Sequence, residues 1–201
     1  MKRMLAVLGA MAWLSACTVV DLDANGKPIL PKDPNAKPGY TNQTPQQIAQ
    51  ESWPTRVMET ANGHALSWAD METKSQTVKA GTRESVFVRA SGVVSVFDDS
   101  NARERTLTLT LTFNGKPVKV SIGPVLRSNA IRDAAGFRFE EFTNQVQYAQ
   151  LTKALNRHAV KQLPPVNASW VNKPVQALMA VTMAQGSVED VVAIELKRGE
   201  P

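Results

Sequence analysis

Residues 106–115 are Thr106-Leu107-Thr108-Leu109-Thr110-Leu111-Thr112-Phe113-Asn114-Gly115. Threonine alternates here with a large apolar residue, which is the period-two pattern of a β-strand with one face in a core. Asn114-Gly115 is typical of the two-residue turn of a β-hairpin, because both residues tolerate positive φ. The alternation resumes after the turn at Val118, Val120 and Ile122, so the sequence predicts an antiparallel hairpin.

A longer strand is predicted before this hairpin, over residues 84–97. One face is formed by Val86, Val88, Ala90, Gly92, Val94 and Val96, and the other by Phe87, Arg89, Ser91, Val93 and Ser95. Glycine weakens the middle of a strand, so Gly92 indicates a bulge or a sharp coil. The turn-forming residues 98–103 then separate this strand from the hairpin.

The C-terminal half supplies one helix and two more strands. Helical spacing extends over residues 140–160, where Phe142, Val146, Ala149 and Lys153 are predicted to form one stripe. Strands follow at 175–183 and 191–196, so the order is strand, strand, strand, helix, strand, strand. This order predicts an α+β, mainly β fold, namely a five-stranded OB-like antiparallel barrel. An open sheet covered by one helix is the alternative, and we favour the barrel because closure removes exposed strand edges.

An N-terminal helical segment precedes the barrel, over residues 44–72. Thr44, Pro45 and Gln47 are typical of a helix start with a capping box and proline in the first turn. Pro54 is expected to kink or split the helix, and Asn62-Gly63 to end its first part. Trp53 is expected to pack on the barrel. Trp170 is expected to fill the core, with an exposed contact as the alternative.

The N-terminus predicts export. Lys2 and Arg3 precede a largely apolar run over residues 4–13, and Leu14-Ser15-Ala16-Cys17 follows. This layout is typical of a secretory signal and is too short to span a bilayer. The last four residues resemble the bacterial lipobox, which implies that the signal, residues 1–16, is removed and Cys17 is acylated, with palmitate as an expected chain. An ordinary secretion signal with an incidental cysteine is the alternative.

The predicted organisation is therefore an anchor, a tether and one domain. Residues 17–45 contain the lipidated Cys17 and a proline-rich, apolar-poor tether, and residues 46–201 form a single globular domain. Within the domain, 46–72 is the helical segment and 84–198 the barrel. Multiple acyl chains would hold the protein on a membrane surface of the cell envelope, facing the periplasm. Thr18 favours the outer over the inner membrane if the host is Gram-negative.

Composition excludes several function classes. The net charge is +5, but Lys and Arg are scattered and aromatic residues make up only 6%, so no nucleic-acid partner is expected. Cys17 is the only cysteine, and His64 and His158 are the only histidines, so we predict no metal site and no cofactor.

A calcium-loop-like segment begins at Asp21. Asp21, Asp23 and Asn25 match the first half of a calcium loop, but Lys32 stands where the closing glutamate is required. We therefore discount calcium in favour of a turn at Asn25-Gly26.

The densest polar stretch lies between the third strand and the helix. It supplies the candidate ligand- or partner-binding residues Arg127, Arg132, Asp133, Thr143, Asn144 and Gln145. The two arginines present planar forks suited to an anion, and the last three residues are expected in the first turns of the helix. The alternative is that these residues cap the helix and satisfy the loop, with Arg132 paired to a carboxylate.

No catalytic pattern accompanies this stretch. Ser128 has no histidine near it in the sequence, and Glu140-Glu141 point apart on a helix. We therefore predict that the protein is not an enzyme.

Three blocks carry a family resemblance: Gly123-Pro124-Val125-Leu126-Arg127, Ala130-Ile131-Arg132-Asp133-Ala134 and Phe142-Thr143-Asn144-Gln145-Val146-Gln147-Tyr148-Ala149. They closely resemble the signature of the bacterial lipoproteins of domain-of-unknown-function family 2291. The lipobox, Trp53 and Gly92-Val93-Val94 fit as well. Ser128-Asn129 departs from the glycine-containing version, and the segment between Trp53 and Glu84 is shorter.

This family has no assigned activity. The resemblance implies an accessory role beside a sugar-type ABC uptake system, with the transporter or its binding protein as the partner. We therefore predict a non-catalytic, membrane-anchored periplasmic binding module. A purely structural envelope lipoprotein without a small-molecule ligand is the alternative.

Overall fold

The computed structural model describes residues 39–199, so Cys17, the signal and the calcium-like residues Asp21, Asp23 and Asn25 lie outside it. The helical elements are α1 (Pro45–Ser52), the π-helix η1 (Trp53–Met58), α2 (Glu59–His64), α3 (Trp68–Thr77), α4 (Ala130–Ala134), the 3-10 helix η2 (Phe139–Glu141), α5 (Gln145–Gln162) and the 3-10 helix η3 (Ala168–Trp170). The strands are β1 (Leu66–Ser67), β2 (Glu84–Asp98), β3 (Glu104–Phe113), β4 (Lys116–Pro124), β5 (Pro174–Ala184) and β6 (Ser187–Arg198). Within the described residues, no helix is both long and apolar enough to cross a membrane.

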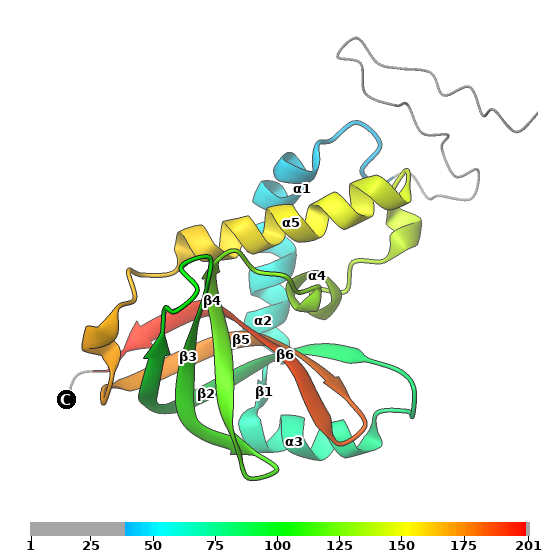
Figure 1. The fold of residues 1–201 in the computed structure, drawn as a ribbon. Helices are drawn as coiled ribbons and strands as arrows, with labels where there is room; N and C mark the ends of the chain where they lie inside the picture. The colour runs from blue at the N-terminus through cyan, green and yellow to red at the C-terminus, as the bar shows by residue number, and fades with distance from the viewer. Residues whose placement is uncertain (1–38, 200–201) are drawn as a thin grey trace, which may run out of the picture.

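Five strands close into a barrel, which confirms the OB-like prediction (Figure 1). Their order is β2-β3-β4-β6-β5, and β5 returns to pair with β2. All neighbours are antiparallel except β4 and β6, which are parallel and share the single register pair Ser121↔Val192. The short strand β1, which the sequence did not predict, pairs in parallel with β2 outside the barrel.

Strand β2 changes partner along its length. Residues 84–93 pair with β5 and residues 94–98 with β3, and Gly92 lies just before this change. A register shift between Val94 and Val96 reverses the faces of the strand. Val96, predicted on the same face as Val94, is therefore 50% exposed while Val94 is buried, and Phe97 packs against the barrel core.

Strand β5 is buried on both faces over residues 177–183. One face contributes Ala177, Met179, Val181 and Met183 to the core inside the barrel. The other contributes Leu178 and Ala180 to a second core, between the barrel and the helices. Such a strand has a continuous apolar sequence without alternation, as residues 177–181 do.

The helices form a layer over the second core. α4 contacts β2, β5 and β6, and α5 contacts α1 and α4 in turn. In Figure 1, α5 lies across the upper end of the barrel with α4 beneath it, whereas α3 lies at the lower end. Trp53 and Phe142 are buried in the second core, and Trp170 fills the barrel core as expected.

The start of α5 corrects the sequence prediction. The helix begins at Gln145 and not at residue 140, because the Asn144 side chain caps it by accepting a hydrogen bond from the Gln147 N–H. Val146 is 45% exposed, so the predicted stripe is not the buried one. Leu151, Ala154, Leu155 and Ala159 form the buried face instead.

The N-terminal helical segment begins as predicted and ends later. Thr44 and Gln47 form the capping box, and Pro54 lies at the start of the π-helical turn that separates α1 from α2. The chain stays helical through Asn62 and Gly63 to His64. The helix that follows extends to Thr77, beyond the predicted residue 72.

The register shift in β2 predicts unequal effects for two valines that the sequence pattern places on one face. Val94→Ala removes two buried carbon atoms and should lower the free energy of unfolding by about 2 kcal/mol. Val96→Ala should change it by less than about 0.5 kcal/mol, because the side chain is half exposed. Urea unfolding followed by circular dichroism measures both, and equal losses would contradict the register.

Candidate functional site

Helix α5 and the segment that follows β4 enclose a pocket of about 740 Å³. One row of α5 contributes Gln145, Ala149, Lys153 and Arg157, and an adjacent row contributes Tyr148, Thr152 and Asn156. Residues four apart lie on the same face of a helix, so both rows point the same way. Residues 124–129 form the facing wall, and Arg132 of α4 completes it. The volume falls in the range of small-molecule sites, about 300–1,000 Å³.

Asn156 fastens the facing wall to α5. Its side-chain Nδ2 donates hydrogen bonds to the carbonyl oxygens of Leu126 (3.1 Å) and Ser128 (2.9 Å). The residue is only 4% exposed. Its Oδ1 is buried and has no hydrogen-bond partner among the described residues.

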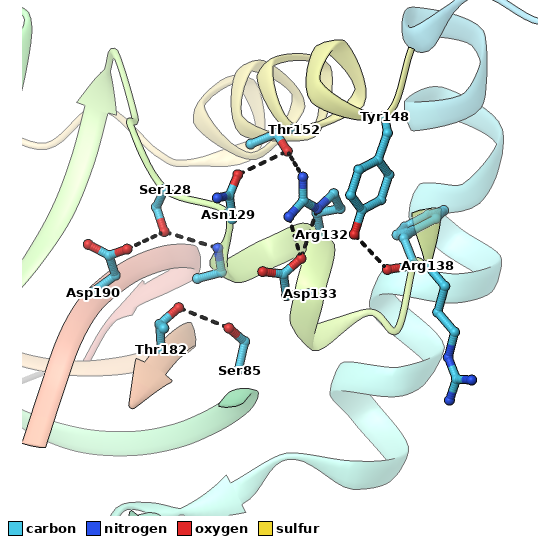
Figure 2. A network of polar contacts seen from close by, with 12 residues as sticks. Ser85, Ser128, Asn129, Arg132, Asp133, Arg138, Tyr148, Thr152, Thr182 and Asp190 are labelled. Carbon is cyan, nitrogen blue, oxygen red and sulfur yellow. Dashed lines mark hydrogen bonds and ion pairs between the residues drawn. The ribbon is translucent and has the colours of Figure 1, made fainter. Parts of the chain in front are cut away.

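Ser128 fastens the same wall to the barrel. Its hydroxyl donates to Asp190 Oδ2 of β6 at 3.1 Å, and accepts a hydrogen bond from the N–H of Ala130 at 3.0 Å (Figure 2). The wall is thus held between α5 on one side and β6 on the other. This arrangement fixes the width of the pocket.

Arg132 lies in the pocket wall in a fixed orientation (Figure 2). Its Nε donates to Asp133 Oδ1 at 2.8 Å, and its Nη1 to the Thr152 hydroxyl at 3.1 Å. The guanidinium carbon lies 3.9 Å from the centre of the Tyr148 ring, a cation–π contact. The side chain is only 12% exposed, so it is a rigid cation whose charge Asp133 partly offsets.

Tyr148 supports this cation and is itself held by the backbone. Burial, which outweighs the opposing effect of the nearby Arg132, raises the pKa of the Tyr148 phenol above its ordinary 10.0. The neutral hydroxyl donates to the carbonyl oxygen of Phe137 at 3.1 Å. The ring therefore presents its face to Arg132 throughout the neutral pH range.

The pocket is electropositive. Four cationic side chains line it, namely Arg127, Arg132, Lys153 and Arg157, and none of the lining residues in the described chain is Asp or Glu. Arg127 is exposed and pairs with Glu104 at 2.7 Å. Within residues 39–199, neither Lys153 nor Arg157 forms an ion pair, and both are exposed. Cations gathered around one hollow raise the local concentration of anions.

The sequence-predicted residues separate into two groups. Arg127, Arg132 and Gln145 line the pocket, and Asp133 is the counter-ion of Arg132. Thr143 and Asn144 precede α5 and do not lie in its first turns as predicted. The Thr143 N–H and hydroxyl donate to Gln147 Oε1, and Asn144 caps the helix, as in the structural alternative.

Five pocket residues of α5 with polar side chains were missed: Tyr148, Thr152, Lys153, Asn156 and Arg157. They could have been found from their spacing, because they follow Gln145 and Tyr148 along the helix at intervals of four residues. This spacing was obscured because Lys153 was assigned to an apolar stripe with Val146.

His158 and Glu141, two of the residues considered for metal binding or catalysis, have structural partners. The His158 ring lies 4.5 Å from the ring of Trp53, and Glu141 pairs with Arg56 at 2.6 Å. In the described part of the chain, no three His, Cys, Asp or Glu side chains group closely enough to hold a metal ion.

The closed barrel with its helix between the third and fourth barrel strands defines an OB-type protein. The chain is similar to a crystal structure of an OB-fold protein from Thermotoga maritima, with a TM-score of 0.57 and 14% identity over 79% of this chain and 99% of that one. At this identity the likeness concerns the fold alone.

The family described as "Predicted periplasmic lipoprotein (DUF2291)" matches residues 7–197. The chain belongs to this family, as the resemblance predicted. Among curated proteins, no match was found.

The contact between Trp53 and His158 predicts a pH dependence. Burial, reinforced by the charge of Lys161, lowers the pKa of His158 below its ordinary 6.5. The unfolded chain therefore takes up this proton at a higher pH than the folded chain does. The contribution of His158 to the free energy of unfolding is fully present above pH 6.5, and it is lost as the pH falls from 6.5 to the lowered pKa. Urea unfolding at pH 7.5 and pH 5.0 should show a smaller pH effect in His158→Gln than in the wild type. Equal pH effects in the two proteins would contradict this.

Proposed function

We propose that the protein is a non-catalytic, lipid-anchored module of the cell envelope that binds a small anionic solute in the pocket between residues 124–129 and α5. The observation that carries this proposal is the set of four cationic side chains around one hollow whose described lining contains no carboxylate. Lys153 and Arg157 attract an anion most strongly, because Asp133 and Glu104 already offset the charges of Arg132 and Arg127.

The volume and lining of the pocket support a small solute. Its walls include apolar surface from Val125, Leu126 and Ala149 beside the cations. Small-molecule sites typically combine such apolar lining with a few placed polar groups. Arg132 is held in place before any ligand arrives, so little side-chain entropy is lost on binding.

The proposed location rests on the N-terminal sequence and on the family. Acylation of Cys17 would attach the mature protein to a membrane, and residues 17–45 would act as its tether. The chain belongs to a family described as predicted periplasmic lipoproteins, which supports a periplasm-facing site. The outer membrane is proposed from Thr18 alone.

The proposed lack of catalysis rests on how the polar groups are used. The Ser128 hydroxyl is bonded to Asp190 and to the Ala130 N–H, and not to a histidine that could activate it. An accessory role beside a sugar-type ABC uptake system, with the transporter or its binding protein as partner, rests on the family resemblance alone.

A purely structural envelope lipoprotein is the second candidate. The observation that favours it is that Arg132, Asp133 and Asn144 already have protein partners. It predicts that the exposed cations of the pocket bind nothing.

The test removes the two exposed cations. Lys153→Ala/Arg157→Ala should abolish most of the rise in melting temperature that millimolar gluconate, citrate or phosphate gives the detergent-solubilised protein. Removing two of four cationic groups around an anion should cost about tenfold or more in affinity.

The matched control is Lys116→Ala/Lys119→Ala, which removes the same charge from exposed positions of β4 outside the pocket. This control should keep the full ligand response. If no anion stabilises the wild type, or if both double variants respond alike, the pocket is not the site and the structural candidate is favoured.

A further inference from the structure

We infer that the ligand of this pocket is a hydroxylated organic anion, one that carries hydroxyl donors a few bonds from its carboxylate or phosphate group. The inference rests on the proposed function and names the chemical class that the site selects. It is carried by Asn156, the buried residue behind the two exposed cations.

The orientation of the Asn156 amide is fixed by its neighbours. Nδ2 faces two carbonyl oxygens, those of Leu126 and Ser128, and gives one hydrogen to each. Turning the amide over would place Oδ1 against both carbonyls, leaving three acceptors together without a donor. The amide oxygen is therefore the group of Asn156 that is left without a partner among the described residues. Because this atom is buried, a ligand group reaches it only when a neighbouring pocket side chain moves aside.

This oxygen needs a donor. It is buried and has no hydrogen-bond partner in the described part of the chain. An unpaired buried acceptor has a free-energy cost, because it has lost its hydrogen bonds to water without gaining others. A carboxylate or the dianion of a phosphate monoester has no proton to donate, so such an acid group held by Lys153 and Arg157 would leave this cost in place. A hydroxyl group on the same molecule would remove it.

The spacing of residues on α5 allows one ligand to carry both the acid group and the hydroxyl group. Asn156 follows Lys153 by three residues and directly precedes Arg157. Side chains three apart on a helix have their Cβ atoms about 5–6 Å from each other. A hydroxyl within a few bonds of the acid group can therefore reach Oδ1 while the acid lies between the cations.

The size and lining of the pocket support an organic molecule over an inorganic ion. A volume of about 740 Å³ is far more than one small ion fills. Pro124, Val125 and Leu126 offer apolar surface for a carbon skeleton, and the Thr152 hydroxyl and Gln145 offer further polar contacts. The class that meets all these conditions includes polyhydroxy acids and phosphorylated polyols.

Matched ligand pairs test the inference without altering the protein. Isothermal titration of the detergent-solubilised chain would compare gluconate with hexanoate, which has six carbons and no hydroxyl, and glycerol 3-phosphate with propyl phosphate, which has three carbons and no hydroxyl on them. We expect the hydroxylated member of at least one pair to bind about tenfold tighter or more, since one hydrogen bond to a buried unpaired acceptor is worth about 1.4 kcal/mol or more. The pair that shows the preference identifies the acid group as carboxylate or phosphate.

The outcomes separate this inference from the proposed function. Equal affinity within both pairs would overturn the hydroxyl requirement while the anion site stands. Binding of neither pair would overturn the proposed function and the inference together. Binding of neutral sorbitol as tightly as gluconate would overturn the anion requirement.

Two variants assign the preference to Asn156. Lys153→Ala should weaken gluconate and hexanoate by the same factor, because the lysine acts on the acid group that both share. Asn156→Leu should bring the gluconate-to-hexanoate ratio close to one, and an unchanged ratio would overturn the assignment. Since Asn156→Leu also loses the bonds to Leu126 and Ser128, its melting temperature must be measured first. If it does not fold, the ligand pairs decide alone.

Discussion

Burial of β5 on both faces is the constraint on which the rest of the fold depends. Residues 177–183 contribute side chains alternately to the inside of the barrel and to the helix-covered outer surface. A barrel alone would expose Leu178 and Ala180, and the helices alone would leave Met179 and Val181 uncovered. The chain therefore needs both layers. This requirement brings α4 onto β2, β5 and β6, and α5 over α4.

The pocket is a consequence of how the two layers join. Strand β4 shares one residue pair with β6 and stays paired with β3 as far as Pro124, and the chain then leaves the barrel and passes along α5. Its backbone carbonyls at 126 and 128 would be unpaired in this position, and Asn156 supplies both donors. The same side chain that fastens the two layers thus leaves its own oxygen without a partner among residues 39–199, on the helix that carries Lys153 and Arg157.

The sequence predicted the elements whose signals are local. The alternation over 106–113, the turn at Asn114-Gly115 and the capping box at Thr44 depend on neighbouring residues, and the order of strands and helix was enough to indicate the barrel. Gly92 indicated a bulge or a sharp coil in this strand, but the position of the bulge, after Val94, could not be predicted, because it depends on pairing with β3. The pocket was predicted only in part. The Arg127–Arg132 segment could be recognised because it lies near α5 in sequence. The residues of α5 that face it could not, because they depend on which side of α5 packs on α1 and α4.

A crystal structure of the protein with gluconate bound would test the central claim most directly. The account predicts the carboxylate between Lys153 and Arg157, with a hydroxyl within hydrogen-bond distance of Asn156 Oδ1 and no change in its bonds to the facing wall. A ligand bound on the outer face of β3 and β4, with the pocket beside α5 empty, would contradict it.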